Sequence, residues 1–145
     1  MSSVIIKTSI PQITEAVKQA LIEVVADTAD DAKKNVEQET YRAHSGRLYP
    51  SRREPGVMHQ ASAPGESFAS DTASLVSGIS IERFGLTNWI DFEDKEGKNR
   101  WSIFEYGGGR IAPRPTVEPT VSNMQDQFTR DCAAAALQAA TKESL

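Results

Sequence analysis

The first third of the chain carries an apolar stripe whose spacing suits one structure, a long amphipathic helix. The members of the stripe recur every three or four residues, at Ile13, Val17, Ala20, Leu21, Val24, Thr28, Ala32 and Val36. This spacing gathers side chains on one face of a helix, whereas a strand would need every second position. Ser9 and Gln12 have the spacing of a capping pair, and Pro11 suits a first turn. We therefore expect a helix over residues 10–42 whose apolar face packs against other elements.

A second long helix is expected near the end of the chain, over residues 119–142. Its apolar stripe comprises Val121, Met124, Phe128, Cys132, Ala135 and Ala139. The alanine run at 133–136 would let another helix approach closely. Cys132 is the single cysteine, so neither an intramolecular disulfide nor a cysteine-rich metal site can form. Because it lies among alanines in a helical pattern, we expect Cys132 to be a small buried residue.

Three strands are expected between these helices, because short runs there alternate apolar and polar residues. They cover residues 79–84, 87–93 and 101–106. The polar residues 94–99 would form the hairpin loop between the second and third strands.

A short helix is expected just before the first strand. Ser70 or Asp71 would cap it and Gly78 would end it. Leu75 and Val76 would then point inward.

Together these elements predict one α+β domain over residues 1–145. An antiparallel sheet of three to four strands would pack against the long N- and C-terminal helices. One face of the sheet would bury apolar residues, which include Ile79, Ile81, Trp89 or Ile90, and Ile103. The length suits one hydrophobic core and not two.

Residues 43–68 form a long segment without usable periodicity, rich in proline and glycine. Connections this long are usually functional or disordered, so a mobile surface loop and an arm that contacts neighbouring subunits both fit. Large apolar groups favour the arm; they are Leu48, Tyr49, Val57, Met58 and Phe68. Because arginine and tyrosine are enriched at interfaces, we expect the contacts to involve Arg47, Tyr49, Arg52 and Arg53.

Charge is distributed unevenly along the chain. It has 16 basic and 20 acidic residues, a formal charge of −4, which disfavours a dedicated nucleic-acid binder. Residues 42–59 nevertheless hold four arginines against one acid, while acids outnumber bases between Glu15 and Glu39. Opposite fields on one molecule suit head-to-tail packing of copies around a ring. A small nucleic-acid-binding module that uses the arginine-rich segment 42–59 is the alternative.

The motifs of catalysis are missing, so we expect no enzyme and no cofactor or metal. His44 and His59 lack metal-ligand spacing, and no Gly-x-Ser-x-Gly elbow occurs. The glycines at 107–109 lack the Gly-Lys-Ser/Thr ending of a phosphate loop. Acids such as Glu82 and Asp91 are routine on exposed strands.

No membrane partner is expected either. The chain has no apolar run near the roughly 18 residues that a membrane span needs. Met1–Lys7 also lacks the apolar core of a signal peptide, which predicts a protein made and used in the cytoplasm.

The stretch from residue 101 to 115 runs from an expected strand through three glycines into a Pro-Arg-Pro corner. Proline fixes φ on both sides of Arg114 and holds this residue extended. This rigidity alone is compatible with a stiff connector between a strand and a helix. We expect instead that Arg114 pairs with an acidic group at a subunit boundary, because guanidinium suits bidentate carboxylate pairing. Glu105 is the leading candidate for that group, and Arg110 is expected at the same interface.

Five short motifs, in this order, resemble the head-tail joining (neck, or tail-completion) family of tailed bacteriophages. The similarity covers residues 41–120. The motifs are Ser45-Gly46-Arg47-Leu48-Tyr49, Ala63-Pro64-Gly65-Glu66, Asp71-Thr72 with Leu75, Glu105-Tyr106-Gly107, and Ala112-Pro113-Arg114-Pro115.

The resemblance implies a structural virion protein, assembled in the host cytoplasm, that forms a ring where head and tail meet, either as a neck or tail-completion protein or as a tail terminator. Its partners would be further copies of itself, six or twelve with six favoured, and the adjacent connector or tail-tube proteins. DNA would pass through the lumen without specific binding.

Overall fold

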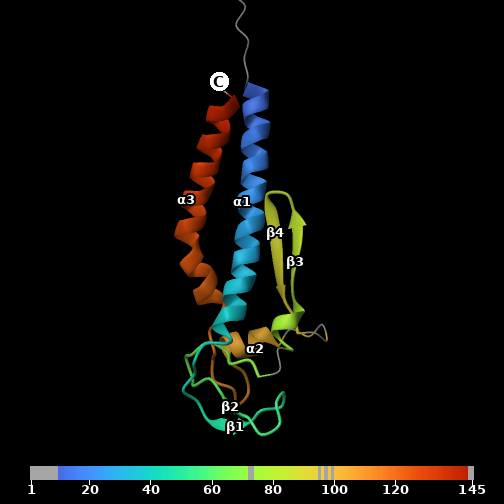
Figure 1. Ribbon diagram of the computed structural model, residues 1–145, viewed down its shortest axis with the longest axis vertical. Coiled ribbons are helices and arrows are strands. Elements are labelled where there is room, and N and C mark those ends of the chain that lie inside the picture. The colour runs from blue at the N-terminus through green and yellow to red at the C-terminus, as the bar shows by residue number, and fades with distance from the viewer. Residues whose placement is uncertain (1–9, 72–73, 95, 97, 99, 144–145) are drawn as a thin grey trace, which may run out of the picture.

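The computed structural model describes residues 10–71, 74–94, 96, 98 and 100–143, and has the predicted α+β class (Figure 1). The elements, in chain order, are α1 (Ile10–Glu39), β1 (Leu48–Pro50), β2 (Met58–Gln60), the 3-10 turn η1 (Val76–Gly78), β3 (Ile79–Phe84), β4 (Thr87–Phe92), α2 (Trp101–Tyr106) and α3 (Val117–Glu143).

Helix α1 forms the middle layer of an elongated molecule. Helix α3 runs along one side of α1, and the β3–β4 hairpin lies along the other side, while β1 and β2 lie below the helices (Figure 1). Helix α1 ends three residues earlier than expected. There the buried Thr40 turns the chain, and its hydroxyl donates to the carbonyl of Glu37 at 2.7 Å.

The β3–β4 hairpin is antiparallel and runs in register from Ile79 opposite Phe92 to Phe84 opposite Thr87. Gly85 makes the turn with φ +65°, a conformation that glycine adopts without strain. Ile81 and Ile90 face each other on the half-buried side against α1. The predicted strand 79–84 is thus confirmed, and the strand predicted over 87–93 ends one residue earlier, at Phe92.

The third expected strand is wrong, because residues 101–106 form helix α2. Both sheets of the described chain have two strands. The expected hairpin loop at 94–99, of which residues 95, 97 and 99 lie outside the described part of the chain, comes between β4 and α2 and not between two strands. The run Trp-Ser-Ile-Phe-Glu-Tyr alternates in polarity only over its first three residues, because Ile103 and Phe104 are both apolar. Trp101 and Glu105 lie one helical turn apart and both are buried. Ile103, expected on a sheet face, is 43% exposed.

The hydrophobic core lies at the lower end of the helix pair. Its buried members are Val36, Leu75, Val76, Ile79 and Trp101, with Phe68, Ile90, Phe92, Phe104 and Val117 packed around them. The expected inward positions of Leu75 and Val76 are confirmed. Residues 72–73 of the expected short helix lie outside the described part of the chain.

The structure also tests the expectations for Gly78 and Cys132. Gly78 ends η1 as expected, and a Cβ there would lie 2.2 Å from the carbonyl oxygen of Glu93, so only glycine fits. Cys132 is half-buried rather than buried. No residue of α3 is fully buried, so the expected α3 stripe covers α1 only in part.

Candidate assembly surface

The carboxylate of Glu105, at the end of α2, caps the N-terminus of α3. Its Oε2 accepts hydrogen bonds from the N–H groups of Thr116 (2.8 Å) and Val117 (2.9 Å). Its Oε1 accepts from the N–H of Glu118 at 2.8 Å. These amides begin a helix and have no partner within it, and a negative charge there complements the helix dipole. Glu105 is only 7% exposed, so its carboxylate serves the fold of its own chain.

Arg114 does not pair with Glu105, and the predicted pair is wrong. The Arg114 Nε donates to the hydroxyl (3.0 Å) and carbonyl (3.2 Å) of Ser62, and Nη1 donates to the carbonyls of Ala112 and Pro113. The backbone explains the difference. The N–H of Arg114 donates to the carbonyl of Phe104, and the amides that begin α3 lie against Glu105, while the guanidinium of Arg114 binds Ser62. The corner is therefore tied to the 43–68 segment.

Part of the 43–68 segment is a small antiparallel hairpin that the sequence analysis did not predict. Its pairs are Leu48 with Gln60, Tyr49 with His59, and Pro50 with Met58. Three-residue strands are too short to show alternation, and Pro50 argues against a strand unless it lies at an edge. The segment thus contains a hairpin of its own, and we refer to residues 43–68 as the arm.

Glu66 fastens the base of the arm. Its carboxylate accepts hydrogen bonds from the N–H groups of Ser45 (3.1 Å) and Ala63 (2.7 Å), and from the Ser45 hydroxyl. The Ser45 hydroxyl and then these two amides lower the pKa of Glu66 to about 2. Hydrogen bonds to the charged form have this effect because protonation would break them.

Asp71 fastens the other side of the arm. Its carboxylate accepts from the Ser51 hydroxyl at 2.6 Å and from the N–H of Arg52 at 2.8 Å, and these bonds lower the pKa of Asp71. Partial burial, and next the charge of Asp71, raise the pKa of Tyr49. The two acids therefore hold the arm through oxygens that are charged at neutral pH.

The two histidines pack into the arm rather than opening to solvent. His44 Nδ1 lies 3.7 Å from Glu66, and His59 Nδ1 lies 3.8 Å from Asp71. Their side chains are 5% and 16% exposed, and each Nε2 is enclosed without a hydrogen-bond partner in the described structure. The Tyr49 ring packs edge-on against His59, with centroids 5.1 Å apart.

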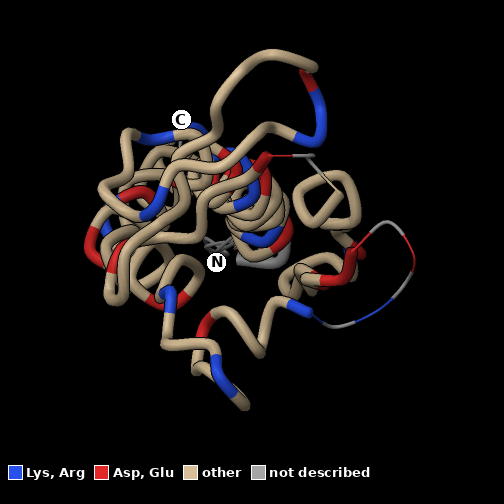
Figure 2. Tube along the Cα trace, turned by 90° about the horizontal axis from the view of Figure 1, so that it is seen from below, with Lys and Arg blue, Asp and Glu red and all other residues tan. Residues whose placement is uncertain are grey.

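Four of the seven residues predicted for the interface lie exposed on loops. They are Arg47, Arg52, Arg53 and Arg110. None of the ion pairs found among the described residues involves any of them. Seen from below, basic positions lie on loops that extend away from the helix axis (Figure 2). Tyr49 and Arg114 are half-buried and Glu105 is buried, so these three have partners within the chain.

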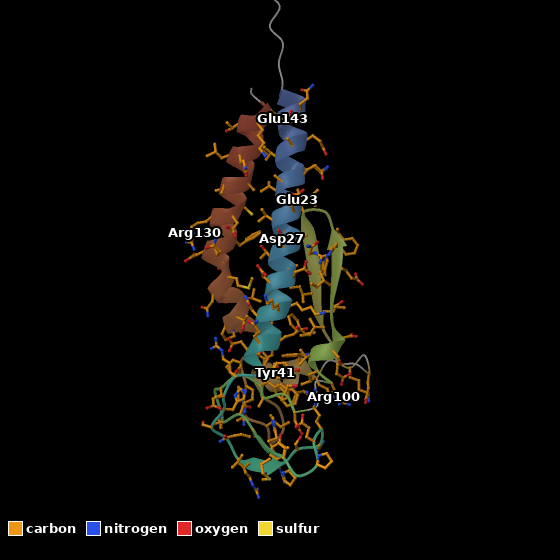
Figure 3. All side chains as sticks on the ribbon, viewed as in Figure 1. Glu23, Asp27, Tyr41, Arg100, Arg130 and Glu143 are labelled. Atoms are coloured by element: carbon orange, nitrogen blue, oxygen red, sulfur yellow. The ribbon has the colours of Figure 1, made fainter. Side chains whose placement is uncertain are left out.

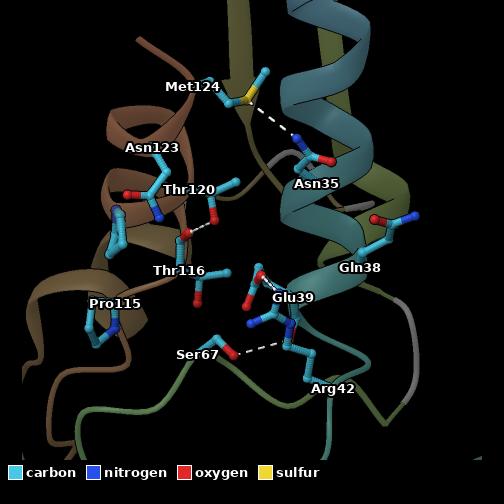
Figure 4. Close-up of a pocket in the computed structure, with 11 residues that line it drawn as sticks. Asn35, Gln38, Glu39, Arg42, Ser67, Pro115, Thr116, Thr120, Asn123 and Met124 are labelled. Carbon is cyan, nitrogen blue, oxygen red and sulfur yellow. Dashed lines mark hydrogen bonds and ion pairs between the residues drawn. The ribbon is translucent and has the colours of Figure 1, made fainter. Parts of the chain in front are cut away.

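A polar hollow of about 620 Å³ separates the end of α1 from the start of α3 (Figure 4). Asn35 donates to the sulfur of Met124 across it at 3.5 Å, and Ser67 donates to the carbonyl of Glu39 at 3.0 Å. Sequence reasoning missed this hollow, because its walls come from segments far apart in the chain and share no local pattern.

Comparison of the chain with family models, with curated proteins and with solved structures finds no match. Within the described residues, no helix is long and apolar enough to span a membrane. Nor do three or more His, Cys, Asp or Glu side chains in this part of the molecule gather as metal ligands would.

Proposed function

We propose that this chain is a structural virion protein that forms a ring at the joint between the head and the tail of a bacteriophage. The ring would contain six copies, or twelve, and would contact the neighbouring connector or tail-tube proteins. It would let DNA pass through its lumen without specific binding. In this proposal the protein acts by assembly and carries out no catalytic step.

The observation that carries the proposal is the position of the residues behind the family resemblance. Glu66, Asp71, Glu105 and Arg114 come from four of the resembling motifs, and each one fastens the arm or the corner. A set of anchors that holds an exposed basic arm in place suits a protein whose task is to contact neighbours. An active site would instead need reactive groups that reach a substrate.

The mass of the native particle tests the proposal. We expect native mass spectrometry and mild crosslinking of the purified chain to give one closed oligomer of six or twelve copies. Electron microscopy of assembled phage particles should then place the ring between head and tail. A chain that stays monomeric at high concentration contradicts the proposal.

The exposed arginines keep one alternative open, a small nucleic-acid-binding module. Arg47, Arg52 and Arg53 lie free of ion pairs with the described residues and could meet phosphates. Such a module would stay monomeric and would bind DNA with an affinity that falls steeply with salt.

A further inference from the structure

The outer face of the β3–β4 hairpin exposes aromatic side chains. Alternation along the strands turns Phe84 and Trp89 away from α1, and they are 61% and 63% exposed. Trp89 pairs with Glu82 and Phe84 pairs with Thr87, so the two rings are diagonal neighbours on one face. Leu86, 50% exposed, extends the apolar surface at the turn. Isolated exposed apolar residues are ordinary, but three large apolar side chains exposed on one strand face and its adjoining turn are what an interaction site would present.

The same face is acidic. Glu82 and Asp91 flank the rings on this side of the hairpin, Glu93 follows just beyond β4, and all three are exposed. The ion pairs of the described chain include none of them.

Arg83 does not neutralise this face, because its side chain turns to α1. Its Nη2 lies 2.6 Å from Asp30 Oδ1, and its Nη1 donates to the carbonyl of Ala26 at 3.2 Å. The outer face of the hairpin thus combines aromatic surface with uncompensated negative charge.

The tip of the arm offers the complementary chemistry. Arg52 and Arg53 lie exposed in the loop between β1 and β2. Beside them Val57 and Met58 are 48% and 54% exposed. This surface combines positive charge with apolar groups, as the hairpin face combines negative charge with aromatic rings.

The two surfaces occupy different levels of one molecule. The β3–β4 hairpin lies alongside α1, whereas β1 and β2 lie below the lower end of the helices (Figure 1). A contact between them therefore joins two copies and is heterologous, the kind of contact that closes rings when repeated.

We propose that the arm tip of one copy docks on the outer hairpin face of the next. Arg52 and Arg53 pair there with Glu82 and Asp91, and a guanidinium stacks on the indole of Trp89. Arginine and tryptophan are the residues that most often dominate interfaces, and a cation over an indole face is favourable. The choice of a second copy as the occupant rests on the proposed ring, while the two surfaces come from the structure itself.

A charge-swap experiment on the full-length chain tests this contact. One variant carries Glu82→Arg and Asp91→Arg, and the other carries Arg52→Glu and Arg53→Glu. Either variant alone should assemble at least about tenfold more weakly than the parent chain, because like charges then meet across the contact. An equimolar mixture should regain the mass of the parent oligomer, since each reversed surface meets its complement in an alternating ring.

A matched control reverses two other exposed acids on the helices, Asp31→Arg with Asp126→Arg. It changes the net charge by as much as the hairpin variant does and should leave assembly unchanged. As a second measurement, assembly of the parent chain should shield the exposed Trp89 from acrylamide quenching.

The outcomes separate the docking inference from the ring itself. A parent ring that survives both reversals, or reversed variants that fail to recover on mixing, overturns the docking inference and leaves the ring standing. A monomeric parent chain overturns both. Recovery on mixing, with Trp89 shielded, supports the docking inference.

Discussion

Glu105 caps α3 although it lies 11 residues before Thr116, the first residue whose amide it binds. Most helices are capped by the side chain of the residue that starts them. Here the starting residue, Thr116, directs its hydroxyl to the carbonyl of Arg114 at 3.0 Å, and the cap comes from α2 instead. The consequence is that α2, the corner and α3 are held as one unit by a single buried carboxylate.

Replacing Glu105 with alanine should lower the free energy of unfolding by about 2–3 kcal/mol, because buried amides lose bonds to a charged partner. Chemical denaturation monitored by circular dichroism measures this change. Glu118→Ala is the matched control, since Glu118 is an exposed acid in the same first turn. Glu118→Ala should lower the free energy of unfolding by about 0.3–1 kcal/mol, because it removes only the interaction of this acid with the helix dipole. Equal losses in the two variants would contradict the capping role.

Glu66 predicts a pH dependence of the arm. Its pKa falls from the ordinary 4.5 to about 2 in the folded chain. A carboxyl whose folded pKa is lowered contributes its full stability above its ordinary pKa, and this contribution is lost as the pH falls from 4.5 towards 2. The pKa of Asp71 is shifted in the same direction, so both anchors weaken in acid.

Amide chemical shifts measure this directly. The N–H signals of Ser45 and Ala63 should stay constant as the pH falls through 4.5 and should move only at lower pH. Glu66→Gln should abolish the movement, while Glu118→Gln should leave it intact. A midpoint near 4.5 in the parent chain would show that the carboxylate does not bind these amides in solution.

Helix α2 closes the hydrophobic core through the side chain of Trp101. Trp101 is 2% exposed, and its ring meets Phe92 and Phe68 with centroids 5.6 and 6.3 Å away. The indole N–H donates to the carbonyl of Leu75 at 3.3 Å. A six-residue helix with little stability of its own is thus fixed by one large side chain.

The chain's two tryptophans give a matched pair for testing this role. Trp101→Ala should lower the free energy of unfolding by about 3–5 kcal/mol, the usual loss for a large core aromatic. Trp89→Ala removes an exposed indole and should change the stability of the monomer by less than about 0.5 kcal/mol. Denaturation should be measured at concentrations that keep the chain monomeric. A small loss for Trp101→Ala would mean that α2 is not needed to close the core.

What could be predicted from the sequence depended on the length of each pattern. The α1 stripe repeats over many turns, so its period was clear and only its end was misjudged. The run at 101–106 fits both a strand and a helix, and its contacts with Phe68 and Phe92, which lie outside the run, decide between them. The β1–β2 hairpin was not predicted for a related reason, because strands of three residues are too short to show a period.

The candidate site was predictable in part. Exposed arginines on an arm could be expected from composition and irregular spacing. The partners of Arg114 and Glu105 could not be predicted. The two side chains could pair with each other, or Arg114 could bind Ser62 while Glu105 binds the amides of α3, and the path of the backbone after Gly107 decides between these arrangements. Glycine turns leave that direction open in a sequence.

In a single copy of the chain, the two long helices are incompletely covered by other elements. Helix α3 has no fully buried residue, and Leu137 on it is 70% exposed. A hollow of about 300 Å³ separates the upper parts of α1 and α3, with Ala16 and Ala139 on its walls. Glu23 and Asp27 of α1 and Glu143 of α3 also line it (Figure 3). An amphipathic helix covered on so little of its surface suits a chain that completes its packing with neighbours.

Neutralising the arm separates the ring from the nucleic-acid alternative. The change replaces Arg47, Arg52 and Arg53 with glutamine and leaves the anchors Glu66 and Asp71 in place. If the arm joins copies, the oligomer mass should fall, while DNA affinity stays weak before and after the change. If the arm binds DNA, the mass should not change.

In the DNA-binding case the dependence of affinity on salt is the second readout. The slope of log affinity against log salt should then shrink by at most about 2.7, roughly 0.9 for each phosphate that the arm no longer neutralises. The matched control replaces Lys18, Lys34 and Arg130, exposed basic residues on the two long helices, and alters net charge equally. Native mass spectrometry and DNA titration at several salt concentrations measure both quantities. An unchanged mass with a reduced salt slope would favour the nucleic-acid module over the ring, because the arm's charges would then be serving phosphates and not neighbouring subunits.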